Sequence, residues 1–398
     1  MIDYVPKHEL ESRLEKFQTM LQGGECGGAI ITHHTNLFYF TGTSQNGFLY
    51  VPRSGAPVLM IRKSFARALQ ESPLDHIVRL DSMKQLPGLI RQAGLSMPDM
   101  IGFELDVIPY NTALFYHQIF QPSRLVDIAG VIRSQRSVKS PYEIERLSHA
   151  CAVLDGVFEK VPAMLRDGMP EVELAGRFEA ELRKGGYAGN ANMRAFNQDF
   201  FMGTLVSGTN GALPTYFDGP VGGAGLSPAN NPHGAGWKPI RKNEIIFIDY
   251  TCVVDGYTAD AARMFVMGTL PEKLRTAHRV ARDILSAITA VAKPGIEARA
   301  IYECAAAMAD KMGLREHFMG QGEDQVRFVG HGVGLELDEL PVFAPGITTP
   351  LEPGMTFAIE PKFVFPEGAV GIENTYVMEE GGVRVLTHFP EDVVSVER

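Results

Sequence analysis

The middle of the chain carries the run Ile248-Asp249-Tyr250-Thr251-Cys252-Val253-Val254-Asp255-Gly256-Tyr257-Thr258-Ala259-Asp260. Apolar and β-branched residues fill both halves of this run, and Asp255-Gly256 is the dipeptide most typical of a two-residue hairpin turn. The run therefore predicts a β-hairpin in which Thr251 pairs with Asp260. Because side chains alternate faces along a strand, Asp249 becomes a diagonal neighbour of Asp260, roughly 7–8 Å away. Two such carboxylates can hold one cation or two adjacent cations; the alternative is a pair of solvated aspartates on an exposed face.

Length and charge limit the class of protein. A chain of 398 residues is long for one core and predicts two domains. Its formal net charge of −10 disfavours nucleic acid and anionic membranes as partners. No apolar run approaches the roughly 20 residues of a membrane-spanning helix. Residues 1–7 lack the basic-then-apolar pattern of a signal peptide, so we expect a cytoplasmic protein.

The first third of the chain alternates short β-rich runs with helical patterns. An amphipathic helix is predicted over residues 8–23, and Phe38-Tyr39-Phe40 is one of the predicted short strands. This alternation is typical of an α/β domain, which we place at residues 1–135. The polar, basic segment 133–140 is expected to link it to a second domain.

The second domain is predicted over residues 141–398. Ser140-Pro141-Tyr142-Glu143 is a helix-start pattern, with a capping serine, proline at the first helical position and glutamate at the third. Two predicted helix pairs, over 141–184 and 271–312, are each followed by strands. We interpret this order as two αα-β halves, an internal pseudo-repeat, with chance similarity as the alternative.

Three more groups with metal-binding chemistry lie downstream. His331 is flanked by Gly330 and Gly332, so a backbone or a ligand can approach it closely. Glu360 and Glu373 each lie in an otherwise apolar, strand-like run. A buried carboxylate is costly unless it is paired, hydrogen-bonded or bound to metal. The alternative for each glutamate is a strand residue on a solvated face.

Taken together, the candidate metal ligands are four carboxylates and one imidazole: Asp249, Asp260, His331, Glu360 and Glu373. Four negative charges match two divalent cations, and this donor set suits Mn²⁺, Fe²⁺, Co²⁺ or Zn²⁺. A water molecule shared by two such cations loses a proton near neutral pH and becomes a nucleophile.

The order of these five residues, with ten residues between the two aspartates, resembles the metal-ligand pattern of the M24 metallopeptidases, the creatinase, prolidase and methionine-aminopeptidase family. The motifs that carry the resemblance are Asp255-Gly256-Tyr257, Arg263, Gly330-His331-Gly332-Val333-Gly334, Ile359-Glu360-Pro361 and Gly371-Ile372-Glu373-Asn374. Asn36-Leu37-Phe38-Tyr39-Phe40-Thr41-Gly42 is similar to a motif of the family's N-terminal domain. The resemblance implies a creatinase-like α/β domain followed by a "pita-bread" catalytic domain with a pseudo-two-fold axis, in a homodimer.

The resemblance also implies roles for the five residues. Asp249 would chelate one cation, and His331 with Glu360 would chelate the other. Asp260 and Glu373 would bridge the two cations, and Glu360 would also move protons during turnover. Arg263 would support the site from beside Asp260.

Two positions depart from the family pattern. Thr215 and Asp338 stand where peptidases of this family usually carry histidines that contact the scissile amide. Thr215 can still donate one hydrogen bond, whereas an ionised Asp338 only accepts and would repel an oxyanion. Asp338 could instead hold a substrate ammonium, or be protonated. His233, in the Gly/Pro-rich loop 218–237, could replace the missing donor; the alternative is a solvent-exposed loop histidine.

The resemblance implies a dinuclear metallohydrolase that cleaves short peptides at Xaa-Pro bonds, similar to Xaa-Pro dipeptidases and aminopeptidases. A second hypothesis keeps the metals and changes the substrate to a C–N or C–S bond of a small metabolite, which the altered Thr215 and Asp338 favour. A third is a non-catalytic binding protein on the same fold. All five ligand positions are filled, which argues against the third.

Overall fold

A computed structural model describes residues 3–198, 201–229 and 232–397. The chain forms two compact units, Met1–Arg136 and Ser137–Arg398. None of the helices in these described ranges is long and apolar enough to cross a membrane.

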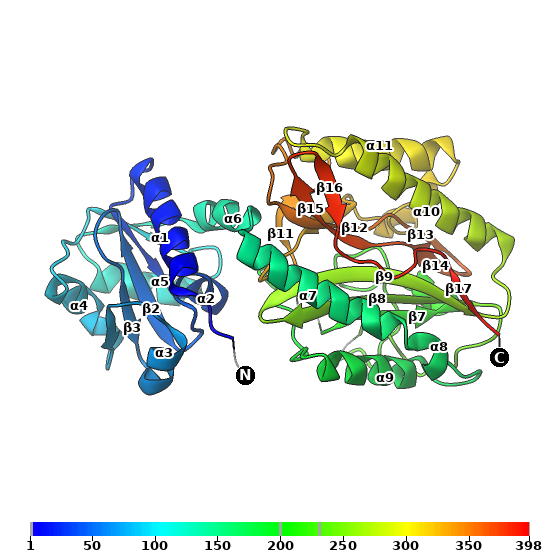
Figure 1. The fold of residues 1–398 in the computed structure, drawn as a ribbon, viewed down its shortest axis with the longest axis horizontal. Coiled ribbons are helices and arrows are strands. Elements are labelled where there is room, and N and C mark those ends of the chain that lie inside the picture. Colours follow the sequence, from blue (N-terminus) through cyan, green and yellow to red (C-terminus); the bar gives the residue numbers. More distant parts are fainter. Residues whose placement is uncertain (1–2, 199–200, 230–231, 398) are drawn as a thin grey trace. The chain divides into compact units, whose positions relative to one another are not determined.

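The N-terminal unit is built on one mixed six-stranded sheet (Figure 1). Its strand order is β4-β3-β2-β1-β5-β6, with antiparallel pairing of β2 to both β1 and β3 and parallel pairing elsewhere. The strands are β1 (Gly28–Ile31), β2 (Gly47–Pro52), β3 (Val58–Ile61), β4 (Ile77–Arg79), β5 (Met100–Phe103) and β6 (Arg124–Asp127). The helices are α1 (Lys7–Gln22), α2 (His34–Thr41), α3 (Phe65–Glu71), α4 (Leu86–Gln92) and α5 (Tyr110–Ile119), with a short 3-10 turn at Met83–Gln85.

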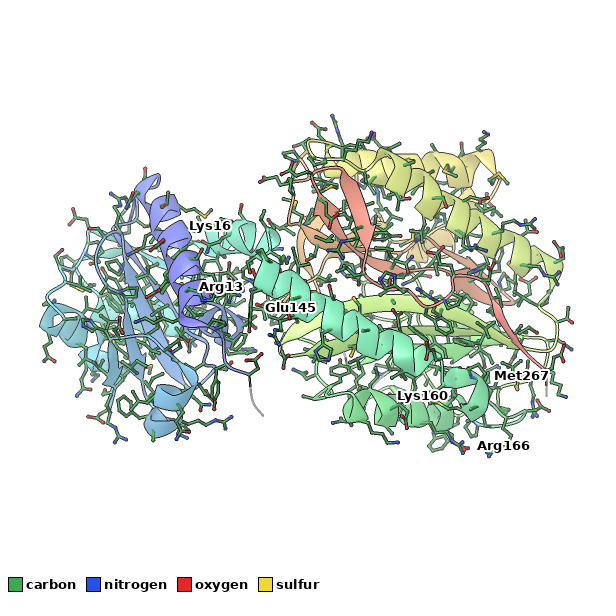
Figure 2. The ribbon with its side chains drawn as sticks, in the orientation of Figure 1. Arg13, Lys16, Glu145, Lys160, Arg166 and Met267 are labelled. Carbon is green, nitrogen blue, oxygen red and sulfur yellow. The ribbon has the colours of Figure 1, made fainter. Side chains whose placement is uncertain are left out.

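A buried polar contact fixes α1 in this unit. Arg13, labelled in Figure 2, donates hydrogen bonds to the Glu9 carboxylate at 2.9 Å and to the Tyr39 carbonyl at 2.8 Å. The Arg13 guanidinium also lies 4.4 Å from the centre of the Tyr39 ring, a cation–π contact. The charge is therefore paired although the side chain is buried.

The prediction of a strand at Phe38-Tyr39-Phe40 is wrong, because these residues lie in helix α2. A short apolar run does not distinguish a strand from a buried helix. Here the buried Glu104 carboxylate favours the helix. It accepts hydrogen bonds from the backbone N–H groups of Thr32 and His33 and from the Asn36 amide at the start of the helix. Gly42, with φ +74°, ends it.

The C-terminal unit contains two helix pairs, each followed by strands, as the αα-β reading predicted. Helices α7 and α9 pack against β7, β8 and β9, and α10 packs against β13, β14 and β16 (Figure 1). The helices are α7 (Pro141–Phe158), α8 (Val161–Met164), α9 (Glu171–Lys184), α10 (Glu272–Val291) and α11 (Ala298–Lys311), with 3-10 turns at Gly208–Ala212, Arg315–His317 and Gly322–Asp324. Ser140 and Glu143 form the predicted capping box of α7. Helix α6 (Ala129–Ser137) includes residues 133–137 of the segment expected to be a linker.

Three sheets carry the strands of this unit. Their orders are β17-β9-β8-β7, β11-β10-β12-β15-β16 and β13-β14. The bounds are β7 (Gly203–Ser207), β8 (Ile245–Val254), β9 (Tyr257–Met267), β10 (Gly330–Gly332), β11 (Glu339–Val342), β12 (Thr356–Ile359), β13 (Lys362–Phe365), β14 (Gly368–Gly371), β15 (Asn374–Glu379), β16 (Gly382–Val385) and β17 (Val394–Val396).

Strands β8 and β9 form the predicted hairpin. Asp255 and Gly256 make the turn with φ values of +52° and +87°, the positive values that a type I′ turn requires. Val254 pairs with Tyr257, and Thr251 pairs with Asp260, in the predicted register. The hairpin therefore presents Asp249 and Asp260 on the same face.

Candidate metal centre

The hairpin supplies the first two acidic side chains of the candidate site. Asp260 is buried, while Asp249 is half-buried. The Asp260 backbone is tied to β15, because its N–H donates to Thr375 Oγ1 at 3.0 Å and its carbonyl accepts from the same hydroxyl at 2.8 Å. This pair of hydrogen bonds holds Asp260 against the sheet that carries the other candidate ligands.

His331, on the short strand β10, is oriented by its own neighbours. Its Nδ1 lies 2.9 Å from the Leu337 carbonyl, so Nδ1 carries the proton and donates it. In the neutral ring, Nε2 then has a free lone pair, the form in which histidine binds metal. The flanking glycines are required for space, because a Cβ on Gly330 or Gly332 would lie 2.2–2.3 Å from a backbone carbonyl oxygen.

Glu360 and Glu373 lie at breaks between strands, whereas both were expected inside strands. Glu360 follows β12 and precedes β13, and Glu373 falls between β14 and β15. In both places the chain passes from one sheet to another. Pro361 explains the first break, since it has no N–H to continue the ladder. The breaks bring both carboxyl groups to the face of the hairpin.

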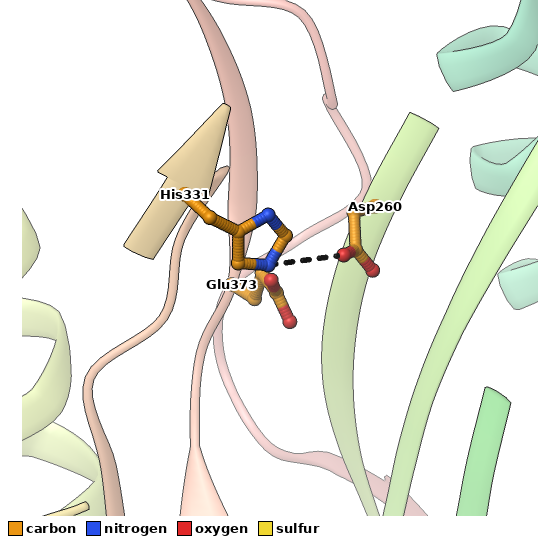
Figure 3. Close-up of side chains that lie close together, drawn as sticks. All are labelled: Asp260, His331 and Glu373. Atoms are coloured by element: carbon orange, nitrogen blue, oxygen red, sulfur yellow. Dashed lines mark ion pairs between the residues drawn. The ribbon is translucent and has the colours of Figure 1, made fainter. Parts of the chain in front are cut away.

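Three of the predicted ligands gather closely enough to share one cation. One ligand atom each from Asp260, His331 and Glu373 lies within 4.8 Å of the others (Figure 3). His331 Nε2 is 3.8 Å from Asp260 Oδ2 and 3.6 Å from Glu360 Oε1. In the part of the chain that the structure describes, no second group of three such residues is found. The oxygen and imidazole donors of this group fit a divalent cation of the Mn²⁺, Fe²⁺, Co²⁺ or Zn²⁺ class.

Lys362 is a member of this cluster that the sequence reasoning missed. Its Nζ donates hydrogen bonds to Asp249 Oδ2 at 2.6 Å, to Glu360 Oε2 at 2.6 Å and to Glu373 Oε2 at 3.0 Å. The side chain is 2% exposed. The available signal was a lysine two residues after Glu360 in the apolar run Phe357–Phe365, because a buried ammonium needs partners of opposite charge.

The electrostatics of the cluster follow from burial and from crowding of carboxylates. Burial raises the pKa of Asp260 and Glu373 well above the usual carboxyl range, and neighbouring carboxylates raise it further. Burial alone would lower the pKa of Lys362, but Asp249, Glu360 and Glu373 outweigh it and raise that pKa. Without a counter-charge, these shifts disfavour the ionised form of Asp260 and Glu373, so a bound cation would stabilise it.

Arg263 supports the cluster in a different way from the one expected. Its guanidinium donates to the Glu373 carbonyl at 2.6 Å and to Asn374 Oδ1 at 2.8 Å. A further bond to the Phe389 carbonyl, at 3.1 Å, completes its contacts with the C-terminal segment. Arg263 thus fixes the backbone at Glu373, through hydrogen bonds to carbonyl oxygens and to the Asn374 side chain.

His233 is buried at 7% exposure, so the alternative of a solvent-exposed loop histidine is wrong. Its Nε2 lies 2.6 Å from Thr204 Oγ1, and its Nδ1 lies 2.9 Å from Thr215 Oγ1. Thr204 pairs with Asp249 across β7 and β8, which places His233 beside the cluster. Burial lowers the pKa of His233 to about 4, so the ring is neutral at pH 7. Residues 230–231 of the predicted loop lie outside the described residues.

A cavity of about 1120 Å³ opens on this side of the C-terminal unit. Its lining includes Thr215, Phe217, Asp218, Arg327 and Phe328. The Phe328 ring centre is 6.5 Å from that of His331, so the cavity lies next to the candidate metal ligands. Asp338 is half-buried and close enough to His331 to raise the pKa of that imidazole, together with Glu360, against the lowering effect of burial.

Sequence profiles of known families match both units. Residues 145–380 match Metallopeptidase family M24, and residues 13–138 match the Creatinase/Prolidase N-terminal domain. The chain belongs to metallopeptidase family M24. The predicted family and the predicted fold class, a creatinase-like α/β domain followed by an M24 domain, are therefore confirmed.

Relatives of this M24 chain span nearly its whole length. It is 26% identical over 387 residues to the uncharacterized peptidase YqhT of Bacillus subtilis, covering 96% of this chain and 99% of that one. It is 25% identical over 382 residues to the Xaa-Pro dipeptidase of Pyrococcus furiosus, covering 95% and 98%. The solved Xaa-Pro dipeptidase of Bacillus anthracis shares its fold, with a TM-score of 0.82, 22% identity and coverage of 97% and 99%.

Proposed function

We propose that this M24 protein is a divalent-metal-dependent hydrolase that cleaves short peptides at Xaa-Pro bonds. The observation that carries the proposal is the group of buried Asp260, half-buried His331 and buried Glu373 beside a cavity of about 1120 Å³. A full-length relative named Xaa-Pro dipeptidase supports the substrate class. When bound, a cation in such a site supplies Lewis-acid chemistry and makes water more acidic.

The protein's own side chains would bind the cation and the substrate and would move the protons. Asp260, His331 Nε2 and Glu373 would hold the cation, with Glu360 as a further ligand, and Asp249 would add a fourth carboxylate beside them. Glu360 Oε1 lies 3.6 Å from His331 Nε2, and Glu360 would also take a proton from the attacking water and return it to the leaving amine. Asp338, beside His331, would hold the substrate ammonium.

Thr215 would contact the scissile carbonyl from the cavity wall. The neutral His233 donates from one ring nitrogen and accepts at the other. In the tautomer with a proton on Nδ1, His233 donates to Thr215 Oγ1, and the hydroxyl proton of Thr215 is free to point at the substrate. His233 then acts as a positioning residue, not as the direct donor that the sequence suggested.

The experiment is a panel of Xaa-Pro dipeptides and tripeptides with protein loaded with Mn²⁺ or Co²⁺. Release of a free N-terminal amino acid, abolished by Asp260→Asn, is the expected result. No turnover by metal-loaded, folded protein would overturn the proposal. Metallation with Mn²⁺, a homodimeric assembly and a cytoplasmic location stay predictions, which metal analysis, sedimentation and cell fractionation test.

A second candidate function is cleavage of a C–N or C–S bond in a small metabolite. The observation that favours it is the cavity wall, where Thr215 is held by His233 and the acidic Asp338 lies beside His331. Mass spectrometry of a metabolite pool incubated with metal-loaded protein tests it. A metal-dependent product from the pool, with every peptide left intact, would decide for this candidate.

A further inference from the structure

Lys362 competes with metal for the carboxylates of the cluster. Its three N–H protons take one oxygen from each of Asp249, Glu360 and Glu373. An ammonium has three donors and no lone pair, so it cannot serve as a metal ligand while it makes these bonds. A cation held by the same three oxygens would lie about 2.0–2.2 Å from each of them. It would be a close neighbour of the ammonium and carry charge of the same sign.

Glu360 and Glu373 each use one carboxylate oxygen for Lys362, which leaves the other oxygen for a different partner. Glu360 Oε2 accepts from Lys362, while Glu360 Oε1 lies 3.6 Å from His331 Nε2. Glu373 Oε2 accepts from Lys362, while Glu373 Oε1 is buried with no hydrogen-bond partner. A buried carboxylate oxygen without a partner is costly unless an ion satisfies it. Glu373 also belongs to the close group with Asp260 and His331. These three side chains, with Glu360 Oε1, leave one cation position that the Lys362 ammonium does not occupy.

The fold holds Lys362 in this place. Lys362 pairs with Gly371 across β13 and β14. A Cβ on Gly371 would lie 2.6 Å from Lys362 Cγ, so the glycine leaves room for the lysine stem. The ammonium also lies 5.7 Å from the centre of the Phe247 ring on β8. The stem therefore packs against β14, and the ammonium lies near Phe247 on β8. These contacts fix the position of the side chain.

We infer that the Lys362 ammonium occupies one of the two cation positions expected from the ligand set, and that the site binds a single divalent cation at Asp260, His331, Glu360 and Glu373. This inference rests on the proposed metal-dependent function and changes its metal content from two ions to one. Asp249 then serves as the counter-ion of Lys362 and not as a metal ligand.

The test counts metal ions per folded chain. Protein freed of metal is dialysed against excess Mn²⁺, and bound manganese is measured by plasma mass spectrometry. The wild type is expected to hold one ion, with the electron paramagnetic resonance spectrum of an isolated Mn²⁺. Lys362→Ala is expected to hold two, with the spectrum of an exchange-coupled pair, because the vacated carboxylate oxygens become ligands. Lys139→Ala, which removes another buried lysine, paired with Glu339 at 2.9 Å, is the matched control and is expected to hold one.

Each result decides between the claims. Two ions in the wild type would overturn this inference and leave the metal-dependent function intact. No ion in the wild type would contradict both. If Lys362→Ala does not fold, the wild-type count and spectrum still decide. Two ions in Lys139→Ala would show that the extra ion does not depend on the cluster lysine, and would also overturn the inference.

Discussion

At the scale of single residues, the two oxygens of Glu373 have different partners. One accepts from Lys362, and the other is buried without a hydrogen-bond partner, in a side chain grouped with Asp260 and His331. A carboxylate that lies between a fixed ammonium and a bound cation needs one oxygen for each of them. Arg263 donates to the backbone carbonyl of Glu373 and so holds this backbone in place. A shift of the backbone would move both carboxylate oxygens at once.

Glu373→Gln is expected to weaken Mn²⁺ binding by at least about 100-fold, since even supporting residues around metal sites often contribute 10–100-fold. Turnover of any peptide substrate should fall with it. Isothermal titration with Mn²⁺ measures the affinity. The control is Glu379→Gln, an exposed glutamate at the end of β15 that pairs with Arg384. Equal Mn²⁺ affinity in wild type and Glu373→Gln would contradict the assignment.

His233 makes stability depend on pH. Its pKa is lowered from 6.5 to about 4 in the folded protein, so the unfolded chain binds the proton more readily. Stability contributed by the neutral ring is therefore complete above pH 6.5 and is lost as pH falls toward 4. Between pH 8 and pH 5 the loss amounts to about 2 kcal/mol.

Urea unfolding at the two pH values, in the wild type and in His233→Gln, measures this term. The variant should show a smaller drop in the free energy of unfolding between pH 8 and pH 5, by about 2 kcal/mol. His149→Gln, at an exposed position on α7, is the matched control. An unchanged pH dependence in His233→Gln would show that His233 is not the source.

At the scale of elements, the hairpin depends on its turn. Gly256 has φ +87°, a conformation that costs an L-residue about 1–2 kcal/mol. Gly256→Ala is therefore expected to lower the free energy of unfolding by that amount, measured by urea denaturation. Gly156→Ala, in the last turn of α7 where a Cβ meets nothing within 4 Å, should be neutral or stabilising. If both variants are equally stable, the turn conformation is not the cause.

How far the sequence predicts these elements depends on how local their cause is. The β8–β9 hairpin and the α7 capping box are determined by adjacent residues, and both were predictable. Helix α2 depends on Glu104, which is distant in sequence, and its apolar run was mistaken for a strand. The positions of Glu360 and Glu373 at strand breaks depend on which sheet each strand joins, which alternation of side chains does not reveal.

The candidate site divides in the same way. The order and spacing of acidic residues and His331 identified Asp260, His331 and Glu373, which lie together. Lys362 was missed because a search for metal ligands passes over cations, although a lysine in an apolar run signals buried partners. The burial of His233 follows from contacts with Thr204 and Thr215 that no local pattern predicts.

At the scale of the whole molecule, all the candidate ligands belong to the unit Ser137–Arg398. Each unit also has its own hydrophobic cluster, one built from residues of β1–β5 and α4–α5 and one from residues after Ser137. Cation binding should therefore stabilise the C-terminal unit by mass action, by about 2.7 kcal/mol at a hundred times the dissociation constant.

Peptide-resolved hydrogen exchange, with and without Mn²⁺, checks this expectation. Protection should rise in peptides that contain β8, β9, β10 and residues 356–376, and peptides from β1–β3 should be unchanged. His331→Ala is expected to remove the effect, because it removes the only imidazole of the cluster in the described residues. A gain of protection confined to the N-terminal unit would contradict the location of the site.

The central claim is that one divalent cation and Lys362 together satisfy the buried carboxylates. Anomalous diffraction at the manganese absorption edge, from crystals grown with Mn²⁺, tests it most directly. We predict a single anomalous peak bounded by Asp260, His331, Glu360 and Glu373, with Lys362 Nζ still bonded to Asp249. Two peaks between the hairpin and Glu373, with Lys362 displaced, or no peak at these residues, would contradict the account.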